Sequence, residues 1–300
     1  MSKTDFLNLA LQNIGNHCSI YTSISFLQSL IMIYPRESQS GRNYSAYSNN
    51  NNEQAGESRE RIVHQLMEHD IFSKLIAGVS NYMQKVATVR VTDEEIAAAN
   101  GIENVAMFGD KISHKDYIDC MTGCIEFLIT NSKSANLSFN NIRNLFKSLV
   151  SQSITEYEQK VFFNFLTKEN DTAVTRERKY LLDERSRTDV FQKIMCNEEQ
   201  LDCSRLGMEG FRCFKMLFLN VNAEHRNINY NVKTGHFEIP DMSIFSKLHG
   251  FETLWTICIE NRDEKVATES RNFLVDLYIK AIVNQEQKKV FCEGFLEKID

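Results

Sequence analysis

A cysteine near the N-terminus is accompanied by residue types that support nucleophilic catalysis. Cys18 follows two asparagines, Asn13 and Asn16, and a histidine stands far along the chain, at His236. In a cysteine hydrolase built from these residues, Cys18 would attack as the thiolate and His236 would act as its base. The side-chain amide of Asn13 or Asn16 would then stabilise the negatively charged oxygen of the intermediate. The sequence therefore holds the residue types for such chemistry.

The order Asn-x-Gly-Asn-x-Cys that ends at Cys18 resembles the cysteine box of ubiquitin-specific proteases, and Gly235-His236-Phe237 resembles the Gly-His-aromatic order of their histidine box. The roles given to Cys18, His236, Asn13 and Asn16 are those that this resemblance implies. Three features depart from that box. Gln28 stands ten residues after Cys18, farther than the glutamine of the box, and the residues between them lack its aromatic-x-Asn-Ser order. The chain between Cys18 and His236 also predicts helices, where that catalytic domain requires a large β-sheet. The pattern therefore favours a loop between two helices, with Cys18 near the start of the second.

Other motifs that carry chemistry are missing from the sequence. It contains no phosphate-binding Walker loop, GxGxxG, HExxH, GxSxG or EF-hand pattern. Its eight cysteines include no CxxC pair, so zinc-ribbon spacing is absent. Cys120 and Cys124 are four residues apart, which places two small hydrophobic side chains on one helix face. We therefore predict no catalytic, cofactor-binding or metal-ligating residues, and no small-molecule ligand.

The composition favours a helical protein and makes some classes of partner unfavourable. The 300 residues are 42% hydrophobic and 25% charged, with only two prolines and twelve glycines, which favours helices. The formal net charge of −6 makes nucleic acid an unfavourable partner. No apolar run reaches the about 18 to 20 residues that span a bilayer, and no secretory leader is visible. We expect a cytoplasmic protein, with the nucleus as a second location, that binds other proteins.

Apolar residues recur at intervals of three and four along most of the chain, the spacing of amphipathic helices. Ser138 is a predicted N-cap, and Asn222 is expected to cap the end of its helix. Trp255 is predicted to anchor a core between helices. The predicted buried stripes are Leu7–Ile14, Ile20–Tyr34, Phe72–Val86, Tyr117–Leu128, Ile142–Leu149, Val161–Phe165, Phe211–Phe218, Leu254–Cys258 and Val266–Ala281. Only two short extended pieces are expected, at Ala87–Thr92 and Asn231–Ile239.

About ten to twelve helices with short connections form either a bundle or a solenoid of helix pairs. The pairs are roughly 40 residues long, close to the armadillo and HEAT period, so we predict an all-α fold, an armadillo/HEAT-like α-solenoid of antiparallel helix pairs. Residues 1–35 are expected to form an N-terminal helical pair, and residues 36–58 a disordered Ser/Asn-rich insertion. Residues 59–300 would continue the same solenoid.

A family resemblance follows from the order of several helix-sized segments. These segments are Ile142–Leu149, Phe163–Leu166, Leu206–Phe214, Val221–Asn222, Lys247–Trp255, Asp263–Ala267 and Phe273–Tyr278. Their order resembles the helical region upstream of the catalytic domain in large fat-facets-type ubiquitin-specific proteases. The resemblance covers about residues 110–300, residues 60–90 are compatible with it, and residues 1–58 are uninformative.

The resemblance implies a non-catalytic α-solenoid scaffold segment of a deubiquitinase, which binds protein partners or ubiquitinated substrates. No catalytic residue of the family has a counterpart in these segments, so none is transferred. The chain ends at Asp300 without a protease domain, and we expect a fragment or a truncated gene model. Two alternatives stay open: a generic helical adaptor unrelated to ubiquitin, and an active cysteine deubiquitinase that uses Cys18 and His236.

Overall fold

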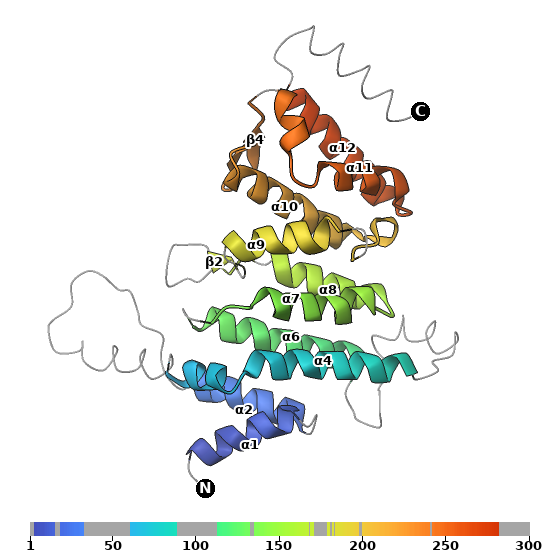
Figure 1. Ribbon diagram of the computed structural model, residues 1–300. Coiled ribbons are helices and arrows are strands. Elements are labelled where there is room, and N and C mark those ends of the chain that lie inside the picture. Colours follow the sequence, from blue (N-terminus) through green and yellow to red (C-terminus); the bar gives the residue numbers. More distant parts are fainter. Residues whose placement is uncertain are drawn as a thin grey trace, which may run out of the picture. The chain divides into compact units, whose positions relative to one another are not determined.

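The computed structural model describes most of the chain as helices (Figure 1). The described residues are 3–15, 19–32, 61–88, 113–132, 135–167, 169–170, 179–180, 182, 184–197, 200–240 and 242–281. They fall into two compact units, Met1–Asp183 and Glu184–Asp300. The predicted insertion at residues 36–58 and the residue Cys18 lie outside the described residues, and the predicted domain boundaries stay a prediction.

The first unit is a succession of packed helices. Their buried residues largely follow the apolar stripes that the sequence predicts: Leu75, Ile76 and Val79, for example, are at most 3% exposed, whereas Val161 is half-buried. Helix α4 packs on α1, α6 and α7, and α6 packs on α8. The elements are α1 (Lys3–Gly15), α2 (Ile20–Met32), a helix over residues 61–68, α4 (Ile71–Thr88), α6 (His114–Thr130), α7 (Phe139–Phe146) with its π-helical continuation η2 (Lys147–Ser151), and α8 (Glu156–Thr167).

Side-chain caps fix where two of these helices begin. The predicted N-cap Ser138 accepts a hydrogen bond from the backbone N–H of Asn141, and Ser113 accepts one from Asp116 at the start of α6. After α8, the short strands β1 (Glu169–Asn170) and β2 (Lys179–Tyr180) pair antiparallel. Of the extended piece predicted at Ala87–Thr92, the first two residues belong instead to α4.

The second unit combines helices with a small hairpin. Its strands pair antiparallel with Tyr230 opposite Phe237, which confirms the extended piece predicted there. The elements are α9 (Glu184–Val190) with its π-helical continuation η3 (Phe191–Met195), the 3₁₀ helices η4 (Cys203–Arg205) and η5 (Met242–Lys247), α10 (Met208–Glu224), the strands β3 (Asn229–Asn231) and β4 (His236–Glu238), α11 (Phe251–Glu260) and α12 (Glu264–Ala281).

Aromatic rings fill the core of the second unit. Phe191, Phe214, Phe218 and Phe273 are each at most 1% exposed, and the rings of Phe218 and Phe273 meet edge to face at 5.5 Å. Trp255 is buried on α11, as predicted. Edge-to-face pairs of this kind add to the free energy gained by burying their area. The core of this unit is therefore held largely by ring packing.

The prediction that Asn222 caps α10 is wrong, because α10 continues to Glu224 and His225 is its C-cap. Asn222 is instead fully buried inside the helix. Its side-chain amide donates to the His249 carbonyl at 3.0 Å, and its side-chain oxygen accepts from the His249 N–H at 2.9 Å. Asn222 thus ties α10 to the segment that leads into α11. None of the described helices is long and apolar enough to cross a membrane.

Candidate functional site

The cysteine and histidine that could do nucleophilic chemistry are not assembled by any described contact. Cys18 lies outside the described residues, so its surroundings carry no information on this interpretation. His236 is an exposed residue of β4. Its backbone N–H donates to the Thr234 hydroxyl at 3.3 Å. The catalytic interpretation therefore gains no structural support from the residues that are described.

Four of the described cysteines are poorly suited to act as nucleophiles. Burial raises the pKa of Cys120 to about 11 and the pKa of Cys124, Cys196 and Cys213 to about 12 each. A nucleophilic cysteine needs the opposite shift, because the thiolate is the reactive form. Within the described ranges, His, Cys, Asp and Glu side chains form no group of three or more that could hold a metal ion. The pair Cys120 and Cys124 therefore behaves as helix-face packing.

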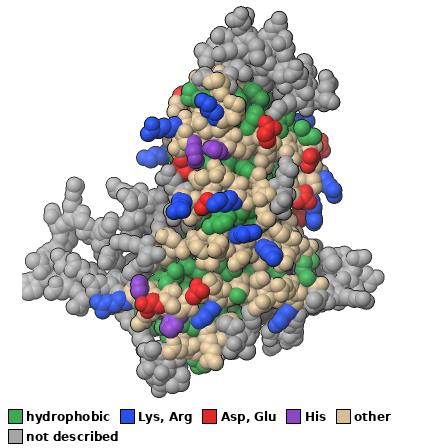
Figure 2. Space-filling view, viewed as in Figure 1, with side chains coloured by type: hydrophobic (Ala, Val, Ile, Leu, Met, Phe, Trp, Pro, Cys, Tyr) green, Lys and Arg blue, Asp and Glu red, His purple; other side chains and the backbone are tan. Residues whose placement is uncertain are grey.

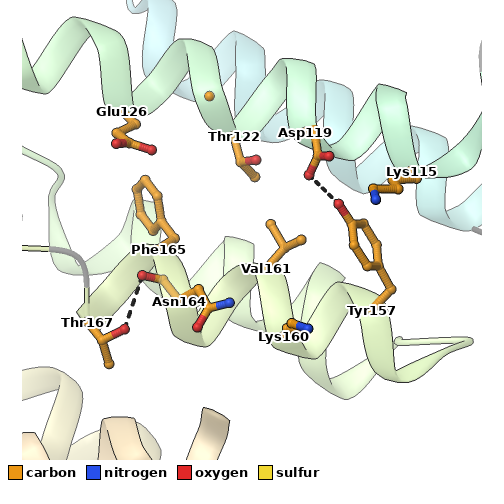
Figure 3. Close-up of a pocket in the computed structure, with 11 residues that line it drawn as sticks. Lys115, Asp119, Thr122, Glu126, Tyr157, Lys160, Val161, Asn164, Phe165 and Thr167 are labelled. Carbon is orange, nitrogen blue, oxygen red and sulfur yellow. Dashed lines mark hydrogen bonds between the residues drawn. The ribbon is translucent and has the colours of Figure 1, made fainter.

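An open groove runs between α6 and α8 in the first unit, with a cavity of about 670 Å³ (Figure 3). Lys115, Asp119 and Glu126 of α6 line it from one side, and Tyr157 and Lys160 of α8 line it from the other. Figure 3 shows Asp119 of α6 and Tyr157 of α8 directed toward one another across the space between the two helices. The groove is large enough to hold several residues of another chain.

A buried polar cluster fixes the two helices that form this groove. His114, the first residue of α6, and Glu158 of α8 are both fully buried, and His114 Nε2 lies 3.2 Å from Glu158 Oε1. The other ring nitrogen of His114 lies 3.1 Å from the Tyr82 hydroxyl on α4. Buried polar side chains cost free energy unless they are hydrogen-bonded, so these contacts favour the packing of α4, α6 and α8 in which the three side chains meet.

Glu158 also closes the first turn of its own helix. Its carboxylate accepts hydrogen bonds from the backbone N–H groups of Ile154 at 3.2 Å and Thr155 at 3.0 Å. Thr155 and Glu158 thus form the T-x-x-E part of a capping box. Burial opposes ionisation of Glu158, but the hydrogen bonds from His114 and Thr155 outweigh it, and the pKa of the carboxyl lies below its usual value. The residue is therefore a carboxylate at neutral pH.

One end of the groove carries a polar pair that links its two walls. The Tyr157 hydroxyl of α8 donates to the Asp119 carboxylate of α6. The Lys115 ammonium lies over the Tyr157 ring, 5.5 Å from its centroid. Lys160 is exposed on the same stretch of α8. This end of the groove therefore presents two ammonium groups beside one carboxylate that already has a hydrogen-bonding partner.

The rest of the groove is lined by both apolar and polar side chains, with Thr122, Asn164 and Thr167 beside Val161 and Phe165. Val161 is half-buried and Phe165 is buried on α8, and Gly123 stands on the α6 side. No heavy atom lies within 4 Å of the position that a Gly123 Cβ would take, so this wall is open. Glu126 of α6 stands at the far end from Lys115, as Figure 3 shows. The groove therefore has Lys115, Lys160 and Asp119 at one end, Glu126 at the other, and both apolar and polar side chains between them.

The sequence alone does not predict this groove. Its walls come from two helices whose stripes are predicted correctly, but the pairing of His114 with Glu158 spans 44 residues and leaves no local pattern. The capping order from Thr155 to Glu158 was the available signal, and it marks only the start of α8.

On the face shown in Figure 2, basic and acidic side chains both reach the surface among neutral ones.

Comparison with known proteins defines the class. The sequence model of the UBP24/USP9X/USP9Y ARM repeat matches residues 1–222. Among curated proteins, ubiquitin carboxyl-terminal hydrolase 24 of Mus musculus and of Homo sapiens are each 21% identical to the chain over 230 residues. These matches cover 76% of this chain and 8% of each relative, so the chain spans a small part of their length.

The chain belongs to the UBP24/USP9X/USP9Y ARM-repeat family. Its fold is an all-α, armadillo-like solenoid, and both the predicted fold class and the resemblance to large ubiquitin-specific proteases are confirmed. The match includes the N-terminal residues that carried no family signal in the sequence. It ends before the segments from Lys247 to Tyr278 on which part of the resemblance rested.

Proposed function

We propose that this chain is a non-catalytic scaffold segment of a large ubiquitin-specific protease, and that it binds protein partners or ubiquitinated substrates for deubiquitination. The observation that carries the proposal is the family match over residues 1–222, which assigns most of the chain to an ARM repeat. Solenoids of stacked helices present extended surfaces, and such surfaces suit protein partners better than small molecules.

Two features of the described residues support this proposal. Burial raises the pKa of Cys124 and the pKa of Cys213 to about 12 each, and such thiols are poor nucleophiles. This chemistry suits a chain that does not carry out hydrolysis itself. The groove between α6 and α8 offers a preformed surface on which a partner segment can dock.

We also propose a cytoplasmic location for the chain, with the nucleus as a second location. The described cysteines are Cys120, Cys124, Cys196, Cys203, Cys213 and Cys258, and all of them are free thiols. Free thiols suit a reducing compartment. Microscopy of the tagged chain in cells would test this location.

The main alternative is a helical adaptor with no connection to ubiquitin. It shares the fold, and the relatives are only 21% identical over a small part of their length, so family membership alone does not separate the two. The partners of the chain do separate them. A scaffold of a deubiquitinase meets ubiquitinated proteins, whereas an unrelated adaptor has no reason to meet them.

Partner identification in cells tests the proposal. The whole chain would be fused to a proximity-labelling enzyme, and labelled proteins would be identified by mass spectrometry with and without inhibition of the proteasome. We expect enrichment of ubiquitinated proteins or of ubiquitin-processing enzymes over a control fusion that carries an unrelated helical solenoid. Recovery of a reproducible partner set without any ubiquitin-linked protein would favour the adaptor.

A further inference from the structure

We propose that His225 and His249, in the second unit, form a binding site for a divalent transition-metal cation of the class of Zn²⁺ and Ni²⁺. Each imidazole ring supplies one nitrogen ligand, and water fills the remaining coordination positions. The inference goes beyond the proposed function and does not depend on it, because no partner protein takes part in the binding.

The two rings come from separate segments that the fold brings together. His225 is the C-cap of α10, and His249 lies in the link between η5 and α11. Their ring centroids are 4.5 Å apart, and the ring planes are inclined at 59°. A cation bound to an imidazole nitrogen at about 2.1 Å lies about 3.2 Å from the ring centre, so two rings that share it have centres within about 6.4 Å. The observed separation meets this limit.

The backbone at His249 is held in place by α10. The buried side chain of Asn222 accepts a hydrogen bond from the His249 N–H at 2.9 Å and donates one to the His249 carbonyl at 3.0 Å. Asn222 lies on the last turn of α10, the helix that His225 caps. One side chain therefore fixes the spacing between the two segments that carry the rings, and such preorganisation reduces the ordering cost of binding.

Hydrogen bonds also orient both rings. His225 Nδ1 lies 2.8 Å from the Val221 carbonyl oxygen, which can only accept, so Nδ1 carries the proton and Nε2 keeps the lone pair. Histidines that bind metals commonly have such a partner on their second nitrogen. His249 Nδ1 lies 3.3 Å from the Gln192 side-chain amide. That amide can turn its oxygen toward Nδ1, which leaves the lone pair of His249 on Nε2 as well.

The surroundings of the pair allow a cation to enter. His225 is exposed and His249 is half-buried, so both rings are in contact with water. The C-terminal end of α10 carries partial negative charge from its aligned peptide dipoles, which favours a cation there. Burial and the neighbouring His225 lower the pKa of His249, so its ring is neutral at neutral pH. The nearest basic residues in sequence, Arg226 and Lys247, are exposed, where water and salt screen their charges.

The ligand set selects the class of ion. Imidazole suits Zn²⁺, Ni²⁺ and Cu²⁺, whereas Mg²⁺ and Ca²⁺ prefer carboxylate and carbonyl oxygens. Glu224 precedes His225 in the chain, but its carboxylate is engaged with Arg187 and Thr188. The pair therefore binds without a carboxylate. Because a structural zinc site has four protein ligands and this site has two, we expect an ion that exchanges with the solvent.

Nickel titration followed by nuclear magnetic resonance tests the site on the purified whole chain. Ni²⁺ is paramagnetic and broadens the signals of protons near it, and a phosphine reductant would keep the cysteines reduced. The imidazole signals would be assigned through single His→Gln variants. We expect the signals of His225 and His249 to broaden first, and Zn²⁺ but not Mg²⁺ to reverse the effect. Equal broadening of the exposed His236, or none at the pair, would overturn the proposal.

Calorimetric titration with NiCl₂ then measures the contribution of each ring. His225→Gln and His249→Gln should each weaken binding about tenfold or more, because each removes one of two protein ligands. The matched control His236→Gln removes an exposed histidine of β4 and should leave the affinity unchanged. Equal affinity of the wild type and the double variant His225→Gln with His249→Gln would place the ion elsewhere, for example on a cysteine, and would overturn the site.

Thermal unfolding separates the loss of a ligand from the loss of folding. Without metal, the double variant should unfold near the wild-type temperature, because Asn222 holds His249 through backbone atoms that the substitution keeps. Added NiCl₂ should raise the unfolding temperature of the wild type and of His236→Gln, since an ion that binds the folded state stabilises it. An equal rise in the double variant, or no rise in any chain, would overturn the proposal.

Discussion

The cores of both units contain packed aromatic rings, such as Phe146 with Phe162 in the first unit, but the two cores differ in their buried polar groups. In the first unit, α4, α6 and α8 meet around a buried carboxylate, Glu158, which contacts His114. In the second unit, α10 and α12 meet around phenylalanine rings, with the neutral side chain of Asn222 as the link to the next segment. Buried polar groups are costly to leave without a hydrogen-bonding partner, whereas ring packing contributes buried area and preferred ring angles.

The candidate groove lies beside the buried polar cluster of the first unit. The groove needs side chains from α6 and α8 at fixed relative positions, and the contact between His114 and Glu158 lies one residue away from both Lys115 and Tyr157. A buried pair of this kind adds little net stability relative to an apolar substitute, but removal of one partner alone is costly. The comparison therefore predicts distinct responses of the two units to substitution and to pH.

The largest effect is expected from Glu158→Ala. The change leaves His114 and the backbone N–H groups of Ile154 and Thr155 without their acceptor, and should lower the free energy of unfolding by about 3 to 5 kcal/mol. Urea denaturation would measure the loss, and hydrogen exchange should rise in α4, α6 and α8. The control Glu68→Ala breaks an exposed pair with His64 and should change little. Similar losses of stability in both variants would contradict a special role for the buried pair of His114 and Glu158.

A smaller effect is expected in the second unit from Gly250→Ala. Gly250 has a φ of +77°, and a Cβ there would overlap the Phe191 ring. Backbone strain and the displaced ring should together lower the free energy of unfolding by about 2 to 4 kcal/mol. Gly235 has a φ of +67° but an open surrounding, so Gly235→Ala should cost only about 1 to 2 kcal/mol. Equal losses of stability at the two glycines, measured by urea denaturation, would show that the Phe191 ring moves aside without a cost in free energy.

Removal of the buried amide should cost less again. Asn222→Ala leaves the N–H and the carbonyl of His249 without their side-chain partner, and should lower the free energy of unfolding by about 1 to 3 kcal/mol. Hydrogen exchange by mass spectrometry should show the increase at residues 247–250. The matched variant Ser246→Ala lies on the exposed 3₁₀ helix beside that segment and should leave exchange there near the wild-type rate. Unchanged exchange in both variants would contradict the role given to Asn222.

The smallest effect is a difference in acid sensitivity. The pKa of Glu158 in the folded protein lies below the ordinary value of 4.5, so its contribution to stability is present above that pH and is lost as the pH falls through the folded-state pKa. Acid should therefore increase hydrogen exchange in α4, α6 and α8 more than in α10 and α12. In Glu158→Gln that extra sensitivity should shrink. If the substitution left the acid sensitivity of exchange unchanged, titratable groups other than Glu158 would be its cause.

The sequence predicts local features of this molecule well and distant ones poorly. Helices such as α4 follow from apolar spacing, and Ser138 is recognisable as a cap, because both signals lie within a few residues. The contact of His114 with Glu158 depends on how helices pack, so no window of sequence contains it. The prediction for Asn222 fails for the same reason, since its partner His249 lies 27 residues away.

The family was recognisable from the order of several helical segments, although no single segment was diagnostic. The groove was not recognisable from the sequence. Lys115 and Lys160 resemble ordinary exposed lysines of amphipathic helices until α6 and α8 are packed together. Sequence periodicity predicts which face of a helix is buried. It does not predict which exposed residues of two helices become neighbours.

The most direct test of a non-catalytic scaffold is a reaction with a ubiquitin suicide probe that traps active-site thiolates. The purified chain would be incubated with the probe and its intact mass recorded, with a Cys18→Ala variant as the control. The account predicts no adduct on either chain. A single adduct on the wild type that is lost in Cys18→Ala would contradict it, because Cys18 would then be an activated nucleophile.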